Sequence, residues 1–256
     1  SSLPACHPGL TSVFYGTTTI APTTITVSGS FVPTSIAGCG IWLDSSDSAS
    51  FTFSSGSNIS QWRDKSGSSN HFTPSSGTPT YISDAGKNVV NFPSDAIMSS
   101  ANQITFSSIN LSAFFIVSKL TGFGSWGAML LGFTNVNGSD YSIRFYDYIL
   151  LGTQAYTDGG GSMGTTNYYV NGTFNPNFGS NVYLNNYTII DTVAPSTSGT
   201  SYLTLSSGFM GRTFVGNIAE FLYYPGGVTS NQRQTIEGYL AQKWGLTSNL
   251  VAGHPG

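Results

Sequence analysis

Two neighbouring stretches decide the expected fold: residues 216–224 read GNIAEFLYY, and residues 230–245 read SNQRQTIEGYLAQKWG. In the first stretch β-branched and aromatic residues follow one another without a breaker, which predicts a buried strand. Three turn-forming residues at 225–227, Pro-Gly-Gly, then end that strand.

The second stretch has the pattern of a short amphipathic helix. Ser230 is the expected N-terminal cap, and Gly245 occupies the place where a left-handed C-terminal residue is needed. Apolar residues recur between them at the spacing of one helix face, namely Ile236, Tyr239, Leu240 and Trp244. The sequence therefore predicts a strand, a turn and a helix in succession.

Three earlier stretches extend this pattern: residues 41–47 read IWLDSSD, residues 59–67 read ISQWRDKSG, and residues 89–92 read VVNF. Together with the two stretches above, they resemble the concanavalin A-like (laminin-G-like) jelly-roll family, which occurs on bacterial surface proteins and in large viruses. The resemblance covers residues 38–248 and implies an all-β sandwich with one short C-terminal helix. A fold hosts many functions, so this resemblance by itself does not identify the function.

The middle of the chain also predicts many short strands. Candidate strands lie at 113–118, 128–131, 141–145, 187–190 and 202–205. Turn residues punctuate them at 136–138, 158–161, 170–172 and 207–208. Short strands at near-regular spacing with a single late helix are typical of a sandwich or jelly roll. We expect one shared core, with the helix against the sandwich edge, that buries Trp42, Trp62, Phe92, Ile218, Phe221, Tyr239 and Trp244.

The composition is that of a folded protein with an uncharged polar surface. Charged residues make up only 7% of the 256 residues, whereas 39% are hydrophobic and 14% aromatic. That apolar content argues against disorder, and the low charge differs from the usual quarter. Secreted β-proteins and subunits of larger assemblies share this composition, so we expect an extracellular, cell-surface or virion-surface location.

The distribution of charge argues against two classes of partner. The net charge is −3, and the eight Lys and Arg residues are scattered along the chain. Nucleic-acid binding needs a basic patch that neutralises phosphates, and no such patch is visible. No apolar run approaches the ~20 residues that span a bilayer, so we expect no membrane insertion.

Composition divides the chain into an arm at residues 1–37 and a domain at 38–256. The arm alternates Thr and Ser with apolar residues and Pro, and residues 20–27 favour strand-like pairing on the domain's own sheet edge or a neighbour's. A disulfide between Cys6 and Cys39 would fasten the arm, contributing ~3–4 kcal/mol by loop closure. The alternative is two separate thiols.

Catalytic residues are not predicted. The glucanases of this fold use two acidic residues on one strand face, but the two glutamates here, Glu220 and Glu237, have no acidic partner at that spacing. Asp140 and Asp147 sit at opposite ends of one strand, about 23 Å apart if extended, whereas glycosidases need ~5–9 Å. Folding could still bring together two acidic residues that are distant in the sequence, and this alternative stays open. We therefore expect a protein that is not an enzyme.

A glycan-binding site is predicted from different residues. Sugars are held by aromatic rings together with amide and carboxylate groups. The region from 126 to 187 is rich in both, although some of its aromatic residues are needed for the core. The candidates are Trp126, Tyr141, Tyr156, Tyr168, Asn137 and Asp158. Calcium is the one candidate cofactor, and Asp140 and Asp158 are its candidate ligands.

These observations leave two function classes close together. One is a non-catalytic surface module that recognises glycans or adheres to a surface. The other is a structural subunit of a surface assembly, such as a viral capsid, decoration or spike protein. A glycoside hydrolase is a distant third. The expected partners are accordingly glycans or neighbouring subunits.

Overall fold

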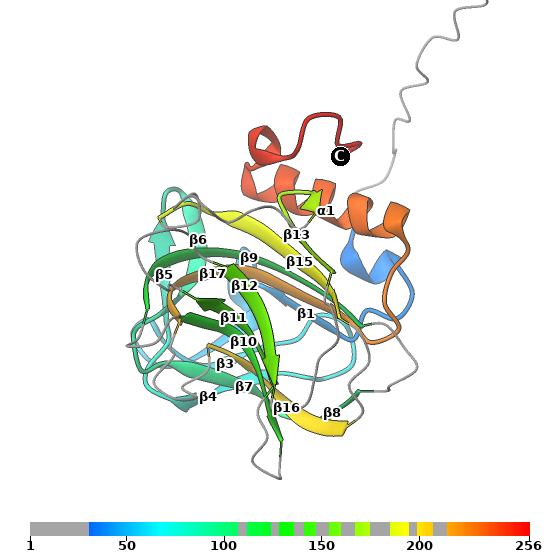
Figure 1. Cartoon of the computed structure of the whole chain (residues 1–256). Coiled ribbons are helices and arrows are strands. Elements are labelled where there is room, and N and C mark those ends of the chain that lie inside the picture. The colour runs from blue at the N-terminus through cyan, green and yellow to red at the C-terminus, as the bar shows by residue number, and fades with distance from the viewer. Residues whose placement is uncertain are drawn as a thin grey trace, which may run out of the picture. The chain divides into compact units, whose positions relative to one another are not determined.

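The structure, a computed structural model, describes residues 31–106, 112–123, 128–135, 141–146, 154–159, 167–174, 185–194, 199–206 and 214–256. Val32–Gly256 forms a compact unit of antiparallel strands. In the described part of the chain one α-helix, α1 (Ser230–Trp244), accompanies the strands and crosses the sheet at the top of Figure 1. The prediction of an all-β sandwich with a late helix is confirmed.

One layer of the sandwich is built around β17, which pairs with β9 along its length and with β1 and β6 on its other side. The strands of this layer are β1 (Ile41–Asp44), β5 (Thr80–Asp84), β6 (Lys87–Phe92), β9 (Ser112–Phe123), β13 (Asn167–Val170), β14 (Thr173–Phe174), β15 (Thr188–Ala194) and β17 (Phe214–Tyr224).

The other layer runs from β4 through β7, β16, β10 and β11 to β12. Its strands are β4 (Phe72–Ser76), β7 (Ile97–Ser100), β8 (Ile104–Phe106), β10 (Ala128–Asn135), β11 (Tyr141–Tyr146), β12 (Gln154–Gly159) and β16 (Gly199–Leu205). A hairpin of β2 (Phe51–Ser55) and β3 (Asn58–Trp62) adjoins it. Short 3-10 helices occupy Pro33–Ser35, Ser48–Ser50 and Thr247–Asn249.

Strand β17 is buried on both faces. Because side chains alternate along a strand, Phe221 and Tyr223 join the core between the layers, whereas Glu220 and Tyr224 point to the opposite face. The neighbouring β1 divides in the same way, with Ile41 and Leu43 in the core. Helix α1 covers the outer face of this layer, so residues on that face are removed from solvent as well.

The expectation that seven residues share one core is wrong in part. Trp62, Phe92, Ile218 and Phe221 belong to the core cluster between the layers. Trp244 is buried outside that cluster, while Trp42 and Tyr239 are only half-buried. The reason is the alternation of strand β1, which sends Trp42 to the outer face, where the residues of α1 meet it.

The termini of α1 explain where the helix begins and ends. Thr229, rather than the expected Ser230, is the N-cap: its Oγ1 accepts from the backbone N–H of Gln232, whose side chain accepts from the Thr229 N–H. Gly245 ends the helix in the predicted left-handed conformation, with φ of 66°. The buried face combines apolar residues with two charged ones, and comprises Arg233, Ile236, Glu237, Gly238, Leu240, Ala241 and Trp244.

The five candidate strands of the middle region are all confirmed within the described residues. The turn expected at 158–161 is partly wrong, because Asp158 and Gly159 continue strand β12. The turn at 170–172 is confirmed by the β13–β14 hairpin, and the segments 136–138 and 207–208 lie outside the described residues. No helix in the described ranges has the length and apolar character needed to cross a membrane.

The arm lies largely outside what the structure describes, including Cys6 and the expected strand at 20–27. Cys39 is a free, half-buried thiol, so the predicted disulfide is not found. The segment from Pro33 onwards contacts the sheet, because the hydroxyl of Tyr224 donates to the Pro33 carbonyl at 2.9 Å.

Candidate functional site

The most organised polar cluster that the structure describes surrounds the carboxylate of Glu220, which is fully buried beneath α1. Its Oε1 accepts from Nε1 of Trp42 at 2.8 Å and from the hydroxyl of Tyr239 at 2.9 Å. Its Oε2 accepts from Nε1 of Trp244 at 2.7 Å and contacts Nζ of Lys243 at 2.8 Å. Four donors therefore occupy the roughly four acceptor positions of one carboxylate.

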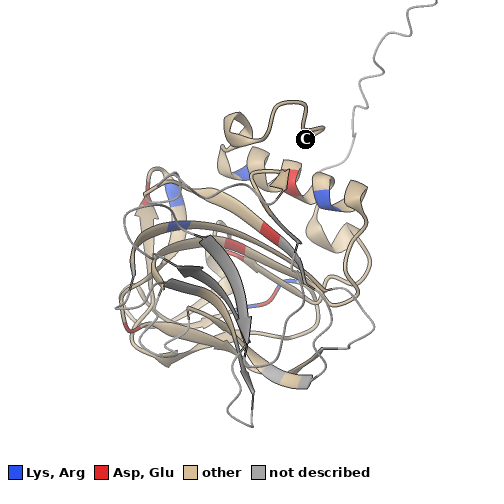
Figure 2. Cartoon of the chain, in the orientation of Figure 1, with Lys and Arg blue, Asp and Glu red and all other residues tan. Residues whose placement is uncertain are grey.

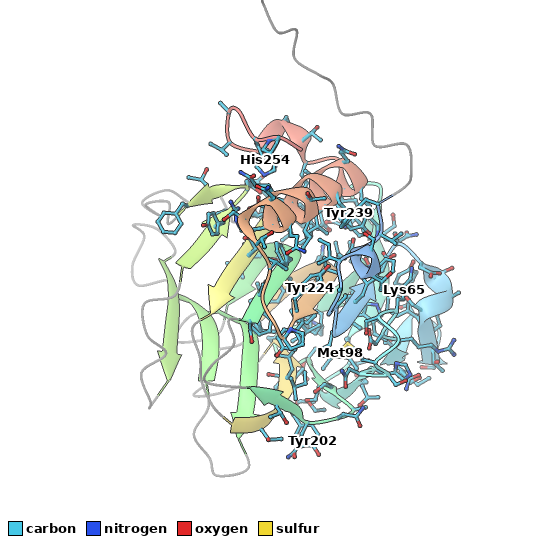
Figure 3. All side chains as sticks on the ribbon, turned by 90° about the vertical axis from the view of Figure 1, so that its right-hand side faces the viewer. Lys65, Met98, Tyr202, Tyr224, Tyr239 and His254 are labelled. Carbon is cyan, nitrogen blue, oxygen red and sulfur yellow. The ribbon has the colours of Figure 1, made fainter. Side chains whose placement is uncertain are left out.

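Asp44 on β1 brings a second carboxylate into the same cluster. It lies opposite Glu220 in the β1–β17 register and is also buried. Nζ of Lys243 contacts its Oδ1 at 2.7 Å, and Nζ of Lys65 contacts its Oδ2 at 2.9 Å. Lys65 also binds Asp47 at 2.9 Å. Figure 3 labels Tyr239 on α1 and Lys65 on the loop after β3.

The two carboxylates respond to this environment in opposite directions. Burial raises the pKa of Glu220, and the charge of Lys243 only partly opposes that effect. Burial would also raise the pKa of Asp44, but the charge of Lys243 and the hydrogen bonds from Lys243, Ser46 and Lys65 outweigh it and lower that pKa. Burial and the neighbouring Glu220 together raise the pKa of Tyr239.

This cluster has the chemistry of a clamp between helix and sheet. Every oxygen of Glu220 already holds a donor, and both lysines are engaged by carboxylates, so binding a substrate at Glu220 would require displacing an existing partner. Removing one member of a buried ion pair leaves a buried charge uncompensated, which is strongly destabilising. The arrangement thus ties β1, β17 and α1 together.

The residues predicted to bind glycans fall into two groups. Trp126, Asn137 and the calcium candidate Asp140 lie outside the described residues. The remaining candidates are placed only at the level of the backbone: Tyr141 on β11, Tyr156 and Asp158 on β12, and Tyr168 on β13.

The backbone register brings three of these positions to neighbouring strands. On β12, Tyr156 lies opposite Arg144 and Asp158 opposite Ser142, while Tyr141 pairs with Gly159. Tyr168 lies elsewhere, opposite Thr192 of β15. Within the described ranges, no group of three or more His, Cys, Asp or Glu side chains is arranged to hold a metal ion.

An aromatic ladder on the β2–β3 hairpin was not predicted from the sequence. Phe51 stacks on Trp62 with ring centroids 5.4 Å apart, and Phe53 stacks on Phe51 at 6.0 Å. Tyr81 contacts both phenylalanines, at 4.7 and 5.9 Å. The ladder begins in the core and ends at Phe53, which is 39% exposed. Its neighbours Thr52, Ser54 and Ser55 are exposed hydroxyl residues.

The signal for the Glu220 cluster was present in the sequence but pointed to the wrong environment. Trp42, Asp44, Lys243 and Trp244 all occur in the stretches that carry the family resemblance. By residue type alone they are typical of core aromatics and turns, because the sequence does not show that β1 and α1 meet over β17. In comparisons with known proteins, no family model and no curated protein matches the chain.

Proposed function

We propose that the protein is a non-catalytic surface module that recognises glycans. The observation that carries this proposal is the aromatic ladder that ends at Phe53. A pyranose ring has an apolar face that stacks on an aromatic ring, and hydroxyl groups that exchange hydrogen bonds with hydroxyl and amide side chains. Phe53 offers such a ring, held in place by Phe51 and Tyr81, on a strand whose residues Thr52, Ser54 and Ser55 are also exposed.

The disposition of charge supports the same proposal. Lys65, Lys119, Arg233 and Lys243 are each bound to a carboxylate. In Figure 2 acidic and basic positions are sparse, and several lie on α1 and the strands beneath it. These four cations thus hold elements together, and exposed hydroxyl and amide groups can contact a neutral ligand.

A glycan array probed with the full chain tests the proposal. We expect binding to a defined set of glycans, weakened about tenfold in Phe53→Ala, equivalent to ~1.4 kcal/mol. Phe174→Ala is the matched control, since Phe174 is also an exposed phenylalanine, at 52%. An array without hits would overturn the proposal. Loss of binding in Tyr156→Ala or Tyr168→Ala, but not in Phe53→Ala, would move the site to the residues predicted from the sequence.

A structural subunit of a surface assembly is the second candidate function. The observation that favours it is the same sequestration of charge, because mutual repulsion between exposed charges normally keeps protein molecules apart. Sedimentation velocity of the full chain and of a chain beginning at Val32 tests this candidate. Assembly that is lost on truncation supports the structural role, and a full chain that stays monomeric at high concentration contradicts it.

A further inference from the structure

A second buried cluster joins residues 250–256 to the outer face of the sheet. The backbone N–H of Val251 donates to the carbonyl of Asn171 in the β13–β14 turn at 3.0 Å. His254, which lies beside α1 in Figure 3, contacts Oε2 of Glu237 through Nε2 at 2.8 Å. Gly256 packs directly on Gly238 of α1. These residues therefore form a strap across the helix, here called the 250–256 strap.

The hydrogen bonds of His254 define its protonation state. Nδ1 accepts from the backbone N–H of Gly256 at 3.0 Å, so it carries no proton. Nε2 therefore carries the proton and donates it to the Glu237 carboxylate. In this arrangement His254 is neutral, and it contributes no charge to the cluster.

The charge of Glu237 is compensated by a single cation. Arg233, one turn earlier on α1, donates to Oε1 of Glu237, and its guanidinium lies 3.6 Å from the ring centroid of Tyr169. Both Arg233 and Glu237 are buried. Arg233 and Glu237 together carry no net charge, which is the condition for burying them.

Asp191 on β15 adds a further carboxyl group that has no cation of its own. It is 1% exposed, and neither of its oxygens has a hydrogen-bond donor. Arg233 is 4.0 Å away, beyond hydrogen-bonding distance and already bound to Glu237. The residues opposite it in the sheet, Tyr169 and Phe115, carry no charge.

Protonation of Asp191 would explain how a buried carboxyl group can lie here without a hydrogen-bond donor or a cation of its own. An ionised carboxylate can only accept hydrogen bonds, whereas a carboxylic acid can donate its proton to the neighbouring Glu237. Burial, followed by the charge of Glu237, raises the pKa of Asp191 well above its usual value, and Arg233 only partly opposes the shift. Geometry and electrostatics therefore agree that Asp191 is the neutral partner.

We propose that a protonated Asp191 holds the 250–256 strap on the sheet, and that ionisation of Asp191 at rising pH releases the strap. Ionisation would give the cluster two carboxylates against the single charge of Arg233, all of them buried. A group whose folded-state pKa is raised stabilises the folded arrangement at low pH and loses that contribution as pH rises through the folded value. Release of the strap lets water and counterions reach the carboxylates.

Hydrogen exchange of residues 250–256 from about pH 5 to about pH 9 tests the proposal, after correction for the intrinsic pH dependence of exchange. In the wild-type chain we expect the protection of these amides to fall about tenfold per pH unit between the ordinary carboxyl pKa of about 3.9, which Asp191 regains on release, and its raised folded-state pKa, because one proton is linked to release. In Asp191→Asn protection should stay constant over that range, since an amide can donate to Glu237 without ionising.

Two variants serve as controls. Gly238→Ala places a Cβ 2.6 Å from the Cα of Gly256, closer than real structures allow, so the strap should lose protection at every pH. Unchanged protection in this variant would overturn the proposal, because the strap would not be held by packing on α1. Asp95→Asn removes an exposed acid and should behave as wild type.

A direct titration keeps the proposal testable if Asp191→Asn does not fold. The carboxyl carbon of Asp191 in the wild-type chain, followed by NMR, should titrate well above the ordinary value of about 3.9. Titration near that ordinary value would overturn the proposal. A wild-type strap whose protection does not change with pH would do the same.

Discussion

Asp44 on β1 and Glu220 on β17 lie opposite each other in the antiparallel register, and Nζ of Lys243 contacts both carboxylates, at 2.7 and 2.8 Å. In the sequence Glu220 has no acidic neighbour at the spacing of a catalytic pair. Folding supplies one from 176 positions away. Both carboxylates are buried, and their oxygens are occupied by hydrogen-bond donors. We therefore interpret the pair as a structural link between strands β1 and β17 and helix α1.

Trp244→Ala should lower the free energy of unfolding by ~3–5 kcal/mol, because it removes a buried indole and leaves Glu220 without one donor. Trp244→Phe keeps most of the apolar volume and should cost ~1–3 kcal/mol, the penalty of the unmade hydrogen bond. Urea unfolding measures both. The exposed control Phe174→Ala should stay within ~0.5 kcal/mol. A Trp244→Ala chain as stable as wild type would contradict the structure.

Asp44 should make the protein sensitive to acid. Its lowered pKa means that its contribution to stability is present above the unfolded value of about 3.9 and is lost as pH falls through the folded value. Asp44→Asn should therefore show a shallower fall of stability below about pH 4. Urea midpoints measured as a function of pH give this slope, with Asp95→Asn as the exposed control. Equal slopes in both variants would contradict the role of Asp44.

We expect no hydrolysis of β-glucans, galactans or sialosides. Glu220 accepts four hydrogen bonds, and Asp44 is only 3% exposed, so neither is available to protonate or attack a glycosidic bond. Release of reducing sugars from a polysaccharide panel is the measurement. Turnover that disappears in a stably folded Glu220→Gln variant would show that this pair is catalytic.

Cys39 should be unreactive in the folded protein. Burial, opposed only in part by a hydrogen bond with Tyr224, raises the pKa of its thiol to about 12, so almost no thiolate exists at neutral pH. Alkylation followed by mass spectrometry should modify Cys39 slowly in the native state and fully in denaturant. A peptide that links Cys39 to Cys6 would instead restore the disulfide predicted from the sequence.

Truncation should locate the boundary between arm and domain. A chain that begins at Val32 retains the compact unit and should keep wild-type stability. Deleting residues 1–37 also removes Pro33, whose carbonyl accepts from the buried hydroxyl of Tyr224, and should cost ~1–3 kcal/mol. Thermal unfolding of the two truncated chains provides the comparison. Equal stability would show that the Pro33 contact contributes little.

Local patterns predicted the elements well, because they depend on residues close together in the chain. The run at 216–224 is a buried strand, and the helix ends at Gly245 as expected. The observed helix cap lies one residue before the predicted one, since Thr229 and Ser230 are both residue types that cap helices. The prediction of a turn at Asp158 was wrong because a strand that is paired with a neighbour can extend through residues that usually form turns.

The candidate site was less predictable for a different reason. Aromatic character shows that Trp42, Tyr239 and Trp244 avoid water, but it does not show which face of the sheet they cover. That choice depends on whether residue 42 or residue 43 of β1 points inward, which the pairing with β17 decides. The ladder ending at Phe53 likewise depends on Tyr81, which comes from a separate strand.

The sequence by itself determined the all-β class, the late helix and the scarcity of charge, because each follows from composition or from a period of a few residues. Only the tertiary structure decided where the charges go. Asp44 and Glu220, or Asp191 and Glu237, are remote in sequence and meet because strand register and the seating of α1 bring them together. When two carboxyl groups lie close together in a buried place, their pKa values shift and they need a cation or a proton between them. No local pattern of residues predicts this.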